Sequence, residues 1–169
     1  MVRRSVLKAE GRPKAAKGRL HSVCNTLLVE ELIILLARRA RVRVQEPIIL
    51  SDDSEPEPDV VIARRSDNYV SSHPLAADIL LVIEVSDSTL KYDRRTKLSL
   101  YAESGISDYW IFNLVEPQLE MYSEPYQKQT GGFDYRVKRV VLPNEVVVIP
   151  GFPDLSLDLS AVFPAQMGE

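Results

Sequence analysis

Hydrophobic and polar positions divide the chain into one long apolar helix followed by a series of short strands. A 3.6-residue period extends from about Lys17 to Arg39 and predicts a helix, whereas Val42–Leu50 alternates and is rich in β-branched residues, which predicts a strand. The apolar members of the helical stripe are Leu20, Val23, Cys24, Leu27, Ile34 and Leu35. Glu31 falls in the middle of this stripe. A core-facing carboxylate is costly unless it is paired or binds a metal, so an arginine partner and a catalytic role are both open for Glu31.

Two further apolar runs predict neighbouring strands in the core. Asp59–Arg64 is expected to run antiparallel to the preceding strand, across the acidic turn Ser51–Pro58. After the polar loop Arg65–Ala77, Asp78–Ser86 is nearly all apolar, as a central strand buried on both faces would be.

The second half of the chain predicts one more helix and several short strands. In order, these are a helix over Lys91–Ser104 with Gly105 at its C′ position, a hairpin of Asp108–Leu114 with Gln118–Ser123, an edge pair of Phe133–Val141 with Glu145–Ile149, and the tail Pro150–Phe163. The pattern as a whole predicts an α/β fold with a mixed central sheet flanked by helices.

Length and composition are those of a globular protein. The 169 residues favour one domain with a real core, which we place at 17–169 after a polar, basic segment at 1–16. No apolar run approaches the ~18 residues that span a bilayer, so no membrane association is expected. The first residues carry charge but no apolar core of a signal peptide, which indicates a cytoplasmic protein. The single cysteine, Cys24, excludes an internal disulfide framework.

Charge is divided unevenly along the chain. The net charge of −3 argues against bulk attraction to nucleic acid, but residues 1–43 carry +8 and the remainder carries −11. Two explanations are open. A basic lobe could hold a phosphate backbone against an acidic site. Alternatively, the four arginines Arg38, Arg39, Arg41 and Arg43 simply follow the end of the helix and flank a strand on a solvated face.

Two acids and a lysine are placed so that they can converge. Asp59 opens one predicted core strand, Glu84 lies at the end of the next, and Lys97 lies on the following helix with Asp93 and Tyr101 at i−4 and i+4. Asp93 and Tyr101 could support Lys97, although Asp93 could equally be an exposed acid paired with it.

The chemistry that fits this set is phosphodiester hydrolysis. Mg²⁺ is commonly held by one or two carboxylates together with water and substrate oxygens. Asp59 and Glu84, with the carbonyl group of Val85, would hold the ion, and Lys97 would face the phosphate. His21 and Cys24 are spaced i, i+3, but no second pair has the spacing of a zinc site.

The same residues resemble a known family. The string PDV at 58–60, followed by LLVIEVSDSTLKYDRRTKLSLYAESGISDYWIFNL from residue 80, is similar in order and spacing to the Uma2 family. That family is assigned to the PD-(D/E)XK nuclease superfamily, and the resemblance covers about Val42–Pro125. It implies a restriction-endonuclease-like fold, with Asp59 and Glu84 as the two acids of the superfamily pattern.

The sequence departs from the superfamily pattern at two places. Ser86 occupies the usual position of the lysine, and the resemblance implies that Lys97 on the following helix replaces it. Glu31 could correspond to a superfamily acid on the first helix. The first 15 or so residues do not resemble the N-terminal segment of the family, which often carries a histidine near the start of this helix.

The function that the resemblance implies is a DNA endonuclease that depends on Mg²⁺ or Mn²⁺. A homodimer would fit this activity, because cleavage of both strands needs two sites. The alternative is a nuclease-fold module that binds nucleic acid or a protein partner without catalysis. If the enzyme hypothesis is correct, the carboxylates of Asp59 and Glu84 should lie close enough to share one cation. Lys97 should point into the same cleft, and Glu31 should face the sheet nearby.

Overall fold

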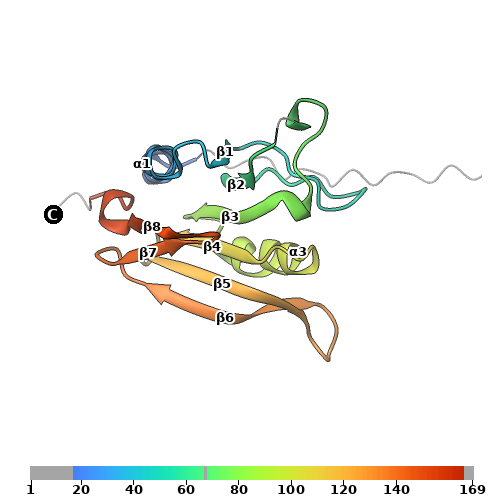
Figure 1. Ribbon diagram of the computed structural model, residues 1–169. Coiled ribbons are helices and arrows are strands. Elements are labelled where there is room, and N and C mark those ends of the chain that lie inside the picture. Colours follow the sequence, from blue (N-terminus) through green and yellow to red (C-terminus); the bar gives the residue numbers. More distant parts are fainter. Residues whose placement is uncertain (1–16, 67, 166–169) are drawn as a thin grey trace, which may run out of the picture.

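A mixed six-stranded sheet forms the centre of the molecule (Figure 1). The computed structural model describes residues 17–66 and 68–165, so the segment predicted at 1–16 lies outside the described residues. The strands follow one another across the sheet in chain order, as β1 (Ala40–Val44), β2 (Val60–Arg64), β3 (Ile79–Ser86), β4 (Asp108–Asn113), β5 (Gln118–Gln127) and β6 (Phe133–Val141). Among these strands, β3 and β4 pair in parallel and the other neighbours pair antiparallel.

The parallel pair requires a crossover, and a helical segment supplies it. Two parallel neighbours cannot be joined by a tight turn, so the chain must cross a face of the sheet between them. The crossover consists of α2 (Leu90–Tyr92), the π-helical η3 (Asp93–Lys97) and α3 (Leu98–Glu103). Gly105 follows with φ +72°, which confirms the left-handed position predicted for it after the helix.

The two faces of the sheet carry separate cores. Residues alternate along β3, so that Ile83 and Val85 face one side and Val82 faces the other. The first side packs against α1 (Arg19–Leu36) and a two-stranded sheet of β7 (Val146–Ile149) and β8 (Phe152–Asp158). The second side packs against α3. Short 3₁₀ helices complete the described elements: η1 (Asn68–Val70), η2 (Ala76–Asp78) and η4 (Leu159–Ala161).

The buried stripe of α1 differs from the predicted one. The buried residues are His21, Cys24, Asn25, Leu28, Leu32 and Leu36, and of the six predicted members only Cys24 is among them. Leu20, Val23 and Ile34 are exposed. Apolar residues occur on every side of this helix, so periodicity alone could not identify its packed face. The polar residues His21 and Asn25 lie on that face instead.

Two strand predictions are also corrected. The strand expected over Val42–Leu50 ends at Val44, because Gln45 takes a left-handed conformation with φ 53° that breaks the ladder. Phe133–Val141 does form a strand, but β6 pairs with β5, whereas β7 pairs with β8 from the predicted tail.

No helix among the described residues is long and apolar enough to cross a membrane.

Candidate functional site

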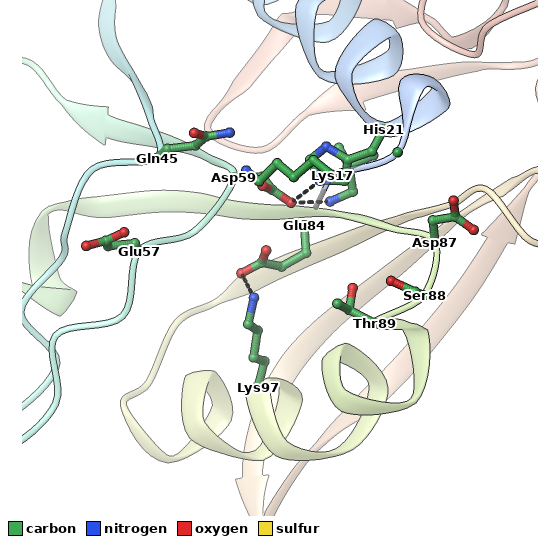
Figure 2. A pocket seen from close by; sticks show the side chains of 12 residues that line it. Lys17, His21, Gln45, Glu57, Asp59, Glu84, Asp87, Ser88, Thr89 and Lys97 are labelled. Atoms are coloured by element: carbon green, nitrogen blue, oxygen red, sulfur yellow. Dashed lines mark hydrogen bonds and ion pairs between the residues drawn. The ribbon is translucent and has the colours of Figure 1, made fainter. Parts of the chain in front are cut away.

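A cavity of about 350 Å³ opens where the start of α1 meets the ends of β2 and β3 and the crossover helix. Figure 2 shows side chains from these elements directed into it. The cavity is lined by Lys17, Gly18, His21, Gln45, Glu57, Asp59, Glu84, Val85, Asp87, Ser88, Thr89 and Lys97. The structure therefore brings Asp59, Glu84, Val85 and Lys97 to one place, as predicted.

Asp59 is held by contacts with four residues from different parts of the chain. It precedes β2, and its carbonyl group accepts the backbone N–H of Gln45 at 3.1 Å. Its Oδ2 accepts the N–H of Val85 at 3.0 Å and lies 3.1 Å from His21 Nε2, while Lys17 Nζ donates to Oδ1 at 3.1 Å. Burial opposes ionisation, but the contacts with His21 and Val85 outweigh it and hold the pKa of Asp59 well below its usual range. This carboxylate is therefore charged at neutral pH.

Glu84 is the most deeply buried acid of the cavity, with 2% of its surface exposed. It follows Val82 and Ile83 on β3, and the alternation of the strand turns its side chain toward the crossover helix. Its Oε1 accepts the hydroxyl of Tyr101 at 2.8 Å and lies 3.0 Å from Lys97 Nζ. Burial raises the pKa of Glu84 to about 8, although the charge of Lys97 opposes the shift.

Lys97 points from the crossover helix into the cavity, which confirms its predicted orientation. Its Nζ lies 3.3 Å from Asp93 Oδ1 as well as close to Glu84. Asp93 is fixed in turn, because its Oδ2 accepts the hydroxyls of Ser86 and Thr89, both at 2.6 Å. Burial disfavours the charged lysine, but attraction from Glu84 and Asp93 prevails and raises the pKa of Lys97 above its usual value. Lys97 is a permanent cation here.

The prediction for Glu31 is wrong. This residue is partly exposed and does not line the cavity. It lies ten residues along α1 from His21, which corresponds to about 15 Å of helix. The error follows from the incorrect choice of stripe.

The two side chains that contact the carboxylate of Asp59, those of His21 and Lys17, were not predicted. Both contact Asp59, from which they are 38 and 42 residues distant in sequence, and no local spacing reveals such a contact. One signal was available, however. His21 and Asn25 are polar residues spaced i, i+4 in the row of Cys24, Leu28 and Leu32, and buried polar residues in an apolar row often serve a site.

The donor set of the cavity fits a hard divalent cation. The described residues hold no group of three or more His, Cys, Asp and Glu that could bind a metal, so a closed zinc site is not indicated among them. Two carboxylates beside an open cavity leave positions for water and substrate oxygens instead, which is the coordination that Mg²⁺ prefers. Asp59 and Glu84 would hold such an ion, with the adjacent carbonyl group of Val85.

Comparisons with known proteins point to nucleases. The family model described as "Uma2: Putative restriction endonuclease" matches residues 8–160. Among solved structures, the chain resembles "a putative nuclease belonging to DUF820" from Anabaena variabilis ATCC 29413, with 18% sequence identity and a TM-score of 0.65. The match covers 92% of this chain and 88% of the other, and at this identity it shows the fold alone. The predicted fold, restriction-endonuclease-like with a mixed central sheet, is thereby confirmed. No curated protein matches the chain.

Proposed function

Because the chain belongs to the Uma2 family, we propose that it is an endonuclease that hydrolyses phosphodiester bonds of DNA with Mg²⁺ or Mn²⁺ as its cofactor. The observation that carries this proposal is the convergence of Asp59, Glu84 and Lys97 on one cavity. Two acids that can hold a divalent ion stand beside a lysine that stays charged, and phosphodiester hydrolysis needs both.

Each side chain has a separate task in this proposal. The bound cation would polarise the phosphoryl oxygen and lower the pKa of the attacking water. Asp59 and Glu84 provide its ligands, and Lys97 lies next to Glu84, where it can stabilise negative charge that develops on the phosphate. His21, which also lines the cavity, contacts the Asp59 carboxylate and fixes its orientation. A homodimer would supply two such cavities for cleavage of both strands.

The test of this function is DNA cleavage by the purified protein. Supercoiled plasmid incubated with Mg²⁺ or Mn²⁺ should be nicked and then linearised, and EDTA should stop the reaction because the cation is removed. Gel electrophoresis measures both products. If no DNA or RNA is cleaved and no metal binds at millimolar concentration, the enzyme proposal fails.

One observation favours a second candidate, a nuclease-fold module that binds without cleaving. Each proposed carboxylate ligand already has a lysine partner, since Lys17 pairs with Asp59 and Lys97 pairs with Glu84. A site whose charges are compensated by its own side chains could persist without a cation. The proposed enzyme must instead allow a cation to compete with these lysines.

This competition predicts an effect at Lys17. Replacing Lys17 with methionine should tighten Mg²⁺ binding by about 1.4- to fivefold, because partly exposed ion pairs contribute roughly 0.2–1 kcal/mol. Isothermal titration calorimetry measures the affinity directly. Lys91→Met removes the same charge from an exposed position outside the cavity and serves as the control. Weaker binding in Lys17→Met would show that Lys17 supports the metal site rather than competing with the cation.

A further inference from the structure

A second buried glutamate, Glu120, lies on the same side of the sheet as Glu84 but outside the cavity. It is fully buried on β5, and its carboxylate accepts hydrogen bonds from Tyr122 at 2.7 Å and Asn113 at 3.2 Å. Arg94 makes the most extensive contact. Its Nε lies 3.1 Å from both carboxylate oxygens, and its Nη2 donates to Oε1 as well. Lys138 approaches to 3.6 Å.

The sheet register connects the two acids. Glu84 on β3 is opposite Ile111 on β4, and Ile111 is opposite Glu120 on β5. The three residues form a row across the strands, so the two acids project from the same face about 10 Å apart. The crossover helix spans this row, with Lys97 bound to Glu84 and Arg94 bound to Glu120. The same short helical segment is thus anchored at two points.

The anchored segment has unusual geometry. Arg94 and Lys97 both belong to η3, whose five residues are π-helical. A π turn is rare, often occurs at functional sites, and shifts the rotation of each side chain relative to a regular α-helix. Because the direction of Lys97 depends on this turn, whatever stabilises the turn also sets the position of its ammonium group.

We propose that Arg94 and Glu120 are positioning residues that fix η3 on the sheet and thereby hold Lys97 against Glu84. This inference rests on the proposed function only for its catalytic consequence. The burial of Glu120 and its set of partners support it, since a carboxylate without them would be costly in this place. Arg94 itself does not line the cavity and acts through Lys97.

The kinetic test compares Arg94→Met with Arg95→Met. Arg95 is the exposed neighbour on the same turn, so its variant controls for the loss of charge. Arg94→Met should lower kcat on plasmid DNA by on the order of ten- to a hundredfold, because small displacements of a catalytic group have effects of this size. KM and the affinity for Mg²⁺ should stay within about twofold of wild type. Arg94→Lys, which keeps the charge but not the two-pronged contact, should recover part of the rate.

A double-mutant cycle separates positioning from a general structural role. In a Lys97→Met background, Arg94→Met should change the remaining rate by less than about twofold, because the residue through which it acts is gone. An equal fractional loss in both backgrounds would overturn the proposal. Full activity of a folded Arg94→Met variant would overturn it too.

Hydrogen exchange tests the same inference without any activity. Amide exchange of residues 93–101 should accelerate by at least about tenfold in Glu120→Gln and Arg94→Lys, and not in Arg95→Met. Glu120→Gln keeps the size of the side chain, which guards against unfolding. If wild-type protein does not cleave DNA but these amides become exposed as expected, the proposed function fails and the positioning pair stands. Unchanged exchange in folded variants would refute the pair.

Discussion

Glu84→Ala is expected to abolish DNA cleavage, because it removes one of the two carboxylates proposed to bind the metal. The loss of Mg²⁺ affinity should exceed the roughly 10–100-fold typical of groups that only orient a ligand. Calorimetry measures the affinity, and plasmid nicking measures the rate. Since Glu84 is buried between Tyr101 and Lys97, alanine also leaves a gap there. Glu84→Gln keeps the shape and the contact with Tyr101, and it should lose metal affinity while the protein remains folded.

The matched control for Glu84 is Glu103→Gln on α3. Glu103 is exposed and does not line the cavity, so its variant should cleave DNA and bind Mg²⁺ as wild type does. Circular dichroism spectra establish that each variant is folded. Cleavage by Glu84→Ala at the wild-type rate would point to a contaminating nuclease. Unchanged Mg²⁺ binding in Glu84→Gln would exclude Glu84 as a ligand.

Lys97→Ala is expected to separate catalysis from metal binding. The variant withdraws a cation from the charge that develops on the phosphate, and loss of one such contact lowers rates on the order of 10²–10³-fold. Mg²⁺ affinity should be retained or increased, because an ammonium group that pairs with Glu84 and Asp93 is removed. Single-turnover cleavage measures the rate, and calorimetry measures the affinity.

Lys91→Ala on the same helical crossover provides the comparison for Lys97. Its side chain is exposed and lies outside the cavity, so both its rate and its affinity should match wild type. If Lys97→Ala lost Mg²⁺ binding together with cleavage, Lys97 would be needed to build the metal site, and its assignment to the phosphate would be wrong.

Short-range sequence patterns predicted the site residues that lie close together in the chain. Asp59, Glu84 and Lys97 lie within 39 consecutive positions: Asp59 just before β2, Glu84 on the adjacent β3 and Lys97 on the helical segment that follows. Strand alternation and helical spacing therefore brought them together without knowledge of the whole fold. The same locality explains why β2, β3 and the β4–β5 hairpin were predicted correctly.

Features that depend on distant contacts were missed. The packed face of α1 was misassigned because its apolar residues do not define a single stripe, so the error placed Glu31 at the site and left His21 out. The predicted partner of β6 was also wrong. The sequence does not show whether a strand pairs with the preceding or the following strand. The π turn at Asp93–Lys97 was also missed, because the sequence pattern predicted one regular helix over Lys91–Ser104.

The burial of Cys24 makes the protein suitable for site-specific labelling. This thiol lies on the packed face of α1, and burial, followed by the charge of Asp59, raises its pKa to about 12. It is therefore both shielded and protonated at the pH at which maleimides react. A cysteine introduced at exposed Ser88 would be the one reactive thiol, so a fluorophore could be attached at the rim of the cavity without removing Cys24.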